Sequence, residues 1–446
     1  MITDTLDPFA AIRASLTTID RTIPVGRIVQ LDGTGFSVEG LSGVARLGDD
    51  IRYRDGSGGL ARAEVVRLDR DGLRATPFGP SAGLALGAEV QAGGPPTLGP
   101  DMGWIGRVID PFGVPLDGRP LRRGIPRAVR GAPPPAAARR AMGARLTTGI
   151  AVLDTMLPLV AGQRVGLFAG SGVGKSTLLG QLARRLEGDV CVLALVGERG
   201  REVADFVRDV LGPEGMARTI IVAATADMPA STRRRAALSA ITVAEYFRDR
   251  GARVTFLCDS VTRLAEAHRE IAVGAGEAAD LRGHPASLTP LLAGLAERAG
   301  PGVDGRGDIT AILSVLVAGS DMEEPVADIV RGQLDGHVVL SRSIAEASRF
   351  PAVDVLRSVS RSLPTAATAE ENALISETRR MLGVMDRSEL MVSSGLYDRG
   401  SSPEIDRAVA LTPRLEEIFT RTDLASPQEG FALIAQRLGR GYSGEG

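Results

Sequence analysis

The sequence predicts an α/β protein with three domains: a small N-terminal β-barrel, a central domain with a mostly parallel sheet, and a C-terminal helical domain. Short alternating apolar segments between Thr22 and Gln91 favour the barrel. From about Thr147 to Arg361, apolar runs alternate with helical segments, as in a parallel sheet covered by helices. After Pro364 only helical patterns occur, and 446 residues accommodate about three domains.

The composition excludes several classes of protein. With 44% hydrophobic and 24% charged residues the chain can bury a core. A net charge of -2 and 4% aromatic residues argue against a nucleic-acid-binding protein. Cys191 and Cys258 both lie in apolar runs, as expected in a reducing compartment, and no apolar run reaches the ~18 residues of a membrane span. We therefore expect a soluble, cytoplasmic protein without a signal peptide.

The domain boundaries follow from changes in pattern. Phe9, Ile12, Leu16 and Ile19 recur at helical spacing, which makes residues 1–20 either an amphipathic docking segment for a partner or membrane surface, or a frayed terminus. We expect the barrel in residues 21–92 and the central domain in residues 93–365, beginning with a Pro-rich connector over residues 93–146. Residues 366–446 form the helical domain.

The strongest motif is QRVGLFAGSGVGKST, in which an apolar strand runs into a Gly-rich turn and then a helix. Backbone N–H groups of such a turn, with the helix N-terminus, bind phosphates, so the segment predicts a nucleotide site. The pattern G-x-x-x-x-G-K-[ST] is matched except at its first position, which is Ala169. The expected nucleotide-binding residues are Ala169, Gly170, Ser171, Gly172, Val173, Gly174, Lys175, Ser176 and Thr177.

Lys175 is the single lysine among 52 basic residues, the rest being arginines. A compositional bias toward arginine explains the general excess. The retained ammonium suits a site where a compact charge must reach the β- and γ-phosphates inside a backbone nest, because a planar guanidinium is larger. The hydroxyl of Ser176 is the expected ligand of Mg²⁺.

Two further strands end in acidic residues. DVCVLALVGERG places Glu198 and Arg199 at the carboxyl edge of the sheet, where α/β proteins bind ligands. Glu198 can deprotonate a water that attacks the γ-phosphate. Alternatively, it begins a solvent-exposed helix or pairs with a nearby arginine. RVTFLCDS ends at Asp259, the expected acidic residue of the Mg²⁺ site.

The histidines and one run of arginines are expected to have structural rather than catalytic roles. His268, His284 and His337 are not at metal-ligand spacing and are expected in the core or in solvent. The run Arg233, Arg234 and Arg235 is expected on a solvated helix face.

A family resemblance rests on five segments in this order: FAGSGVGKSTLL, VGERGREV, FLCDSVTRLAEAHREI, DMEEPVADIVRGQLDGHVVLSR and FPAVDVLRSVSR. Together they resemble the catalytic subunits of rotary ATP synthases and, more closely, the ATPases of type III protein export, with AGSGVGKS similar to the flagellar branch. The resemblance implies a RecA-like P-loop domain that binds ATP and Mg²⁺. The family's Pro-rich pore loop, between Ile271 and Gly300 here, has fewer prolines in this chain.

The resemblance also implies individual roles. Glu198 matches the carboxylate that activates water, and Arg361 matches an arginine finger that reaches the site of a neighbouring subunit. Phe350 matches an aromatic residue beside adenine. Arg199 and Arg263 match arginines near the phosphates, and either can instead be part of a structural ion pair.

The resemblance implies an ATPase that drives flagellar protein export, releasing chaperones and passing their cargo to the export gate. Its implied partners are five more copies of the chain in a homo-hexamer, an ATPase regulator, a central stalk protein, chaperone–substrate complexes and the export gate at the cytoplasmic face of the inner membrane. The alternatives are a virulence secretion ATPase, a rotary ATP synthase subunit, a nucleotide-binding subunit without turnover and an RNA translocase.

Overall fold

The computed structural model describes residues 22–279, 281–317 and 323–444. The chain forms two compact units, one ending at Pro96 and the other running from Thr97. The expected docking segment, residues 1–20, lies outside the described residues. The further division of the second unit into a nucleotide domain and a helical domain stays a prediction.

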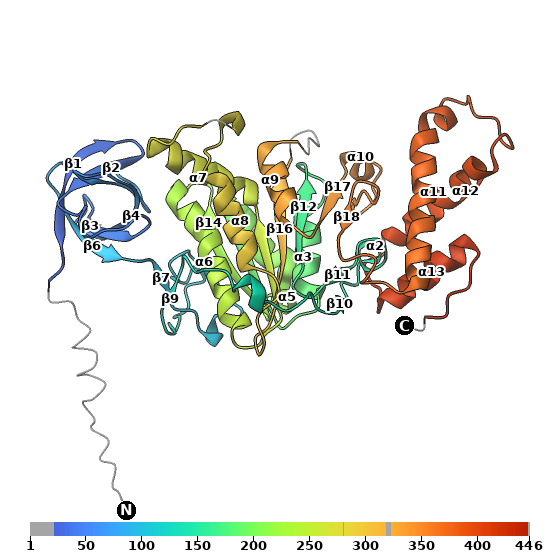
Figure 1. Cartoon of the computed structure of the whole chain (residues 1–446), viewed down its shortest axis with the longest axis horizontal. Helices are drawn as coiled ribbons and strands as arrows, with labels where there is room; N and C mark the ends of the chain where they lie inside the picture. Colours follow the sequence, from blue (N-terminus) through green and yellow to red (C-terminus); the bar gives the residue numbers. More distant parts are fainter. Residues whose placement is uncertain (1–21, 280, 318–322, 445–446) are drawn as a thin grey trace, which may run out of the picture. The chain divides into compact units, whose positions relative to one another are not determined.

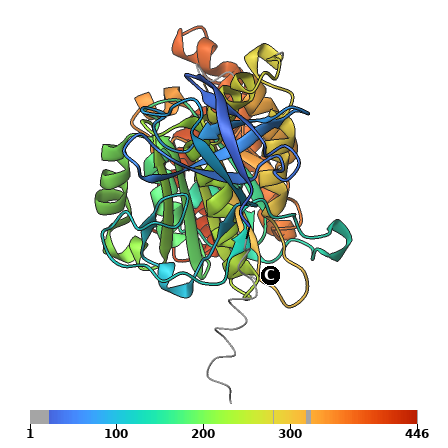
Figure 2. The same ribbon diagram turned by 90° about the vertical axis from the view of Figure 1, so that its left-hand side faces the viewer.

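The first unit contains a closed barrel, drawn in blue in Figures 1 and 2. Alternation along its strands buries Phe36 and Val38 against Tyr53 in the barrel interior. The barrel predicted from the sequence is therefore confirmed. Its strands, in the order β1-β2-β5-β4-β3-β6, are β1 Val25–Asp32, β2 Gly35–Glu39, β3 Asp50–Arg54, β4 Leu60–Leu68, β5 Leu73–Pro77 and β6 Glu89–Gly94.

The second unit is built on an eight-stranded sheet in the order β18-β17-β12-β16-β15-β13-β14-β8. Neighbouring strands are parallel except β18, which pairs antiparallel with β17. The mostly parallel sheet expected from the sequence is thus confirmed. Its strands are β8 Val108–Ile109, β12 Arg164–Ala169, β13 Val190–Glu198, β14 Thr219–Thr225, β15 Val254–Asp259, β16 Ile309–Leu316, β17 Gly336–Leu340 and β18 Val359–Ser360.

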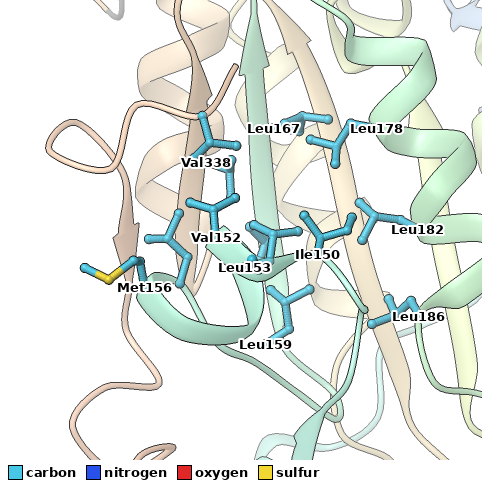
Figure 3. Close-up of a cluster of buried hydrophobic side chains, with 14 of the residues drawn as sticks. Ile150, Val152, Leu153, Met156, Leu159, Leu167, Leu178, Leu182, Leu186 and Val338 are labelled. Carbon is cyan, nitrogen blue, oxygen red and sulfur yellow. The ribbon is translucent and has the colours of Figure 1, made fainter. Parts of the chain in front are cut away.

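Helices cover both faces of this sheet (Figure 1). One apolar cluster joins alternate strand residues to α2 and α3, and Figure 3 shows Leu167 of β12 beside Leu178 of α3 within it. The other cluster joins the intervening strand residues to α6, α7, α8 and α9. These helices are α2 Ala151–Met156, α3 Lys175–Arg185, α4 Gly200–Asp205, α5 Gly212–Met216, α6 Ala230–Arg248, α7 Val261–Gly274, α8 Leu288–Arg298 and α9 Pro325–Gln333.

The end of the chain is helical, as expected (Figure 1). A capping box between Thr368 and Glu371 starts α11, and Ser402 and Ser426 cap the next two helices. None of the helices in the described ranges is long and apolar enough to cross a membrane. The late helices are α10 Arg342–Glu346, α11 Ala369–Ser393, α12 Pro403–Phe419 and α13 Pro427–Leu438.

The short elements lie mainly in the connector and loops. They are the strands β7 Thr97–Leu98, β9 Arg127–Ala128, β10 Arg145–Leu146 and β11 Leu159–Val160, the 3-10 helices η1 Met102–Trp104, η2 Ala136–Ala138 and η4 Leu281–Gly283, and the π-helix η3 Phe206–Leu211.

The expectation of a solvated face at Arg233–Arg235 is wrong for two of the three residues. Arg234 and Arg235 are buried. Arg234 lies 3.1 Å from Nδ1 of His268, and the Arg235 guanidinium lies over the ring of Phe112. Hydrogen bonding and ring contact allow a long charged side chain to be buried, which a run of three arginines does not reveal.

Candidate nucleotide site

Three strands bring the expected chemical groups to one edge of the sheet. β12 ends at Ala169, β13 at Glu198 and β15 at Asp259. The strands are parallel and in register, with Leu195 opposite Asp259 and Ala169 opposite Leu316. Their carboxyl ends therefore meet at the same edge, where open α/β sheets bind ligands.

The Gly-rich turn between β12 and α3 leaves backbone N–H groups available to an anion. Gly172 has a φ of 78° and Gly174 a φ of 87°, both in the left-handed region that favours glycine. No side chain caps the start of α3 at Gly174, and Ser176 and Thr177 are exposed. The first-turn N–H groups and the positive end of the helix dipole thus face an open site suited to phosphate.

Lys175 and Asp259 form an ion pair across this edge. Both side chains are almost buried, with 11% and 4% exposed. Ser314 on β16 donates a second hydrogen bond to the same carboxylate oxygen, Oδ1, at 2.7 Å. The ammonium expected to reach phosphate therefore balances the acidic residue in this state.

Glu198 lies beside this pair in an environment that disfavours its charge. Burial raises the pKa of its carboxyl group to about 7, with further contributions from the charge of Asp259 and from a hydrogen bond with Glu202. A carboxylate whose pKa lies near neutrality is suited to accept a proton from water at physiological pH. These electrostatics suit the general-base role that the sequence predicts for Glu198.

The donor set fits a magnesium ion held together with nucleotide phosphates. The Ser176 hydroxyl has no hydrogen-bond partner among the residues that the structure describes, and the Asp259 carboxylate already faces a cation. Within the described ranges, no group of three or more His, Cys, Asp or Glu side chains could hold a metal by itself. Mg²⁺ usually takes one or two protein ligands plus phosphate and water, and Ser176 and Asp259 offer two such oxygen ligands.

The two candidate arginines near this edge are paired with acidic side chains. Arg199 is largely exposed and lies 3.6 Å from Glu202. Arg263, in the first turn of α7, binds Glu266 at 2.9 Å. A methyl group added at Gly197 would lie 3.3 Å from Cβ of Arg263, so this arginine packs against the end of β13.

Phe350 lies against the Gly-rich turn although it is far away in the sequence. A Cβ at Gly174 would come within 3.2 Å of its ring, which is half-exposed. Its neighbours Arg349 and Pro351 line a cavity of about 380 Å³ that also borders α11 and α12, and Arg349 pairs there with Glu416 of α12. A half-exposed aromatic ring therefore lies beside the Gly-rich turn, as expected for a residue that contacts a bound nucleotide.

Arg361 is the one candidate that the structure does not bring to this site. It follows β18, whose Ser360 pairs with Gly336 at the start of β17, while Leu340 at the end of β17 pairs with Ala169. At about 3.3 Å per residue, roughly 13 Å of strand separates the two ends. The guanidinium is exposed, and it forms no hydrogen bond or ion pair with any residue in the described ranges.

Sequence reasoning missed two residues at the site. Ser314 is a polar residue inside the apolar strand ITAILSVL, and this interruption was the available signal. Glu202 lies in the first turn of α4, just after the strand that ends at Glu198, and gave no signal, because acidic residues are common at that place in a helix.

Comparisons with known proteins agree with this geometry. Residues 149–360 match the model of the ATP synthase alpha/beta family, nucleotide-binding domain, and residues 367–422 match the T3SS EscN ATPase C-terminal domain. The flagellum-specific ATP synthase of Bacillus subtilis (strain 168) is 43% identical over 385 residues, covering 85% of this chain and 87% of that protein.

Two solved structures also match over most of the chain. The assembled ATPase EscN from the enteropathogenic E. coli type III secretion system has a TM-score of 0.86 and 34% identity, covering 93% of this chain and 100% of that one. EscN in complex with its central stalk EscO has a TM-score of 0.82 at the same identity and coverage.

The fold and the site define a P-loop ATPase. The chain belongs to the ATP synthase alpha/beta family and, within it, to the type III secretion and flagellar export ATPases.

Proposed function

We propose that this ATPase drives flagellar protein export by hydrolysing Mg·ATP at interfaces between its own subunits. The observation that carries the proposal is the convergence of Lys175, Glu198 and Asp259 at one edge of the sheet. Arg361 lies elsewhere, exposed and without a partner among the residues that the structure describes. One chain thus supplies the phosphate site, the base and the acidic residue. The positive charge of Arg361 remains available to stabilise the transition state in the site of another chain.

The residues act as follows. Lys175 exchanges Asp259 for the β- and γ-phosphates, which the N–H groups of the Gly-rich turn also bind. Ser176 and Asp259 would hold Mg²⁺, which neutralises charge that develops on the phosphates. Glu198 orients the attacking water and accepts its proton. Phe350 supports the base, and Arg199 and Arg263 are released from their acidic partners toward the phosphates.

A homo-hexameric ring accounts for the position of Arg361. Its guanidinium cannot serve the nucleotide at the opposite edge of its own sheet without a rearrangement of β17 and β18. In a closed ring each subunit offers its exposed Arg361 to the site of a neighbour. The assembled state of EscN supports the same arrangement here.

The flagellar branch is favoured by the identity to the Bacillus subtilis protein. In this role the ring releases chaperones, feeds flagellar proteins to the export gate, and lies peripherally at the cytoplasmic face of the inner membrane. Its partners are the ATPase regulator, a central stalk protein and chaperone–substrate complexes, and no nucleic acid. The complex of EscN with EscO supports the stalk partner, and residues 1–20 are the proposed docking segment.

A virulence secretion ATPase is the second candidate. The match of residues 367–422 to the EscN C-terminal domain and the likeness to EscN favour it. Both candidates share the hydrolytic chemistry and differ in the cargo that they export.

Export in the native bacterium separates the two candidates. We expect deletion of the chromosomal gene to abolish secretion of the flagellar hook and filament proteins, and the wild-type gene, but not the Glu198→Gln variant, to restore it. Intact flagellar secretion with lost effector secretion would instead assign the protein to a virulence system. Loss of neither, with no ATPase activity of the purified protein, would contradict both.

A further inference from the structure

One row of side chains across the sheet contains two polar residues among apolar ones. On one side of the row, Leu195 of β13 pairs with Asp259 of β15, and the register of β15 and β16 places Ser314 beside Asp259. On the other side, Ser314 of β16 pairs with Leu167 of β12, which in turn pairs with Val338 of β17. Side chains of paired residues on parallel strands point to the same face. The three apolar members of the row belong to the core cluster on the α3 side, part of which Figure 3 shows.

Ser314 is completely buried in this row. A hydroxyl group in an apolar core is unfavourable unless it is hydrogen-bonded. Its bond goes to Oδ1 of Asp259 at 2.7 Å, and no donor in the described ranges reaches the other oxygen, Oδ2. One oxygen of the acidic residue is therefore fixed from within the sheet, while the second is left for a ligand.

Asp259 accepts hydrogen bonds from Lys175 and Ser314, and only one of these donors can move away. Lys175 is the first residue of α3, and its side chain has to leave Asp259 and contact the phosphates when nucleotide binds. Ser314 lies in the middle of a central strand and cannot leave. Once Lys175 has moved, Ser314 is the remaining direct donor to the carboxylate among the described residues.

We propose that Ser314 is a positioning residue that holds the Asp259 carboxylate in the orientation required for Mg²⁺ after Lys175 has moved to the nucleotide. The inference rests on the proposed role of Asp259 in the magnesium site. It extends that role to a residue that touches neither nucleotide nor metal. Groups that orient metal ligands in this way are typically worth 10–100-fold in metal affinity.

Calorimetric binding of ADP to the full chain, measured with excess Mg²⁺ and with EDTA, tests the proposal. In Ser314→Ala we expect the gain in ADP affinity that Mg²⁺ provides to fall about 10-fold. Affinity in EDTA should stay unchanged, because the Gly-rich turn and Lys175 are intact. In steady-state assays the apparent KM for Mg²⁺ should rise more than kcat falls.

Two variants separate the hydrogen bond from simple packing. Ser314→Cys fills the same space with a much weaker donor, so its Mg²⁺-dependent affinity should lie closer to that of Ser314→Ala than to wild type. Ser239→Ala removes another buried hydroxyl, which donates to the Pro111 carbonyl on the other face of the sheet, and should bind Mg·ADP normally. Wild-type affinity in Ser314→Cys, or an equal loss with and without Mg²⁺ in Ser314→Ala, would overturn the inference.

Asp259→Asn distinguishes failure of this inference from failure of the site itself. If Mg²⁺ does not strengthen ADP binding to the wild type, or strengthens it equally in Asp259→Asn, the proposed magnesium site is wrong. If Asp259→Asn loses the gain and Ser314→Ala keeps it, only the role of Ser314 is refuted.

Discussion

The two ends of β17 present opposite electrostatic situations within one sheet. At the carboxyl edge, Lys175 is almost buried and paired with Asp259, and a hydroxyl group adds a second bond. At the other end, Arg361 is exposed, borders a separate cavity of about 560 Å³ and has no acidic partner in the described ranges. One basic group is satisfied by its own chain, and the other is not.

This difference shows which part of the chemistry one chain can perform alone. In the proposed mechanism, Lys175 exchanges Asp259 for the phosphates of the nucleotide, a step that would need no second subunit. An unpaired guanidinium in solvent contributes nothing until an anion reaches it, and transition-state phosphate is such an anion. We therefore expect binding to belong to the monomer and rapid turnover to belong to the assembly.

The largest expected effect on turnover follows from removal of the Arg361 guanidinium. Arg361→Ala should lower kcat of the assembled protein by about 10³–10⁵, the range for an arginine finger, with nucleotide affinity of the monomer unchanged. Stopped turnover together with normal ADP binding in calorimetry is the expected signature. Unchanged hydrolysis in the ring would contradict the assignment.

A mixing experiment sharpens this prediction. Lys175→Ala and Arg361→Ala should each be inactive alone, since one lacks the phosphate ligand and the other the finger. In mixed rings about a quarter of the interfaces combine an intact Lys175 with an intact Arg361 from the neighbour, so activity should partly return. Absence of any recovery, with mixed assembly verified, would place Arg361 in the site of its own chain.

Glu198→Gln is the next largest change and acts at the paired edge. The amide keeps the size of the side chain but cannot accept a proton, so kcat should fall by about 10²–10⁴. Mg·ATP binding should persist, because Lys175 and Asp259 are untouched. Near-normal hydrolysis would remove Glu198 from the mechanism and leave it as the last residue of β13 with no catalytic role.

The next effect is smaller: kcat of the unmodified protein should vary by about one order of magnitude or less with pH. Because burial, Asp259 and Glu202 raise the pKa of Glu198 to about 7, kcat should rise with pH through that value as the base ionises. The folded protein then holds a proton that the unfolded chain releases above its ordinary pKa of 4.5, so Glu198 lowers the free energy of unfolding as pH rises from there to about 7.

Glu202→Gln tests the cause of this shift. An amide at this position removes a charge and can donate to Glu198, so the midpoint of the kcat profile should move to lower pH by up to about one unit. An unmoved midpoint would mean that Glu202 does not act on the base.

The sequence predicted the sheet edge that carries Lys175 and Asp259 better than the opposite end, where Arg361 lies. Strand ends are readable, because an apolar run that stops at Glu198 or Asp259 places that residue at a sheet edge whatever the rest of the fold does. Arg361 follows a two-residue strand, and the role expected for it rested on family resemblance alone. Burial of Arg234 and the bond of Ser314 depend on contacts between distant strands and helices, which local patterns do not encode.

The smallest expected effect concerns Phe350, which joins the Gly-rich turn to a more distant part of the chain. An aromatic stacking contact is worth about 0.5–1.5 kcal/mol beyond the area that it buries, so Phe350→Ala should weaken nucleotide binding several-fold. The loss should be the same for ATP and ADP with or without Mg²⁺, because the ring beside Gly174 would stack on the base, which both nucleotides share. Phe350→Tyr keeps the ring and should bind normally. A loss confined to ATP would mean that the ring senses the γ-phosphate through the turn, and the base-stacking role would then be wrong.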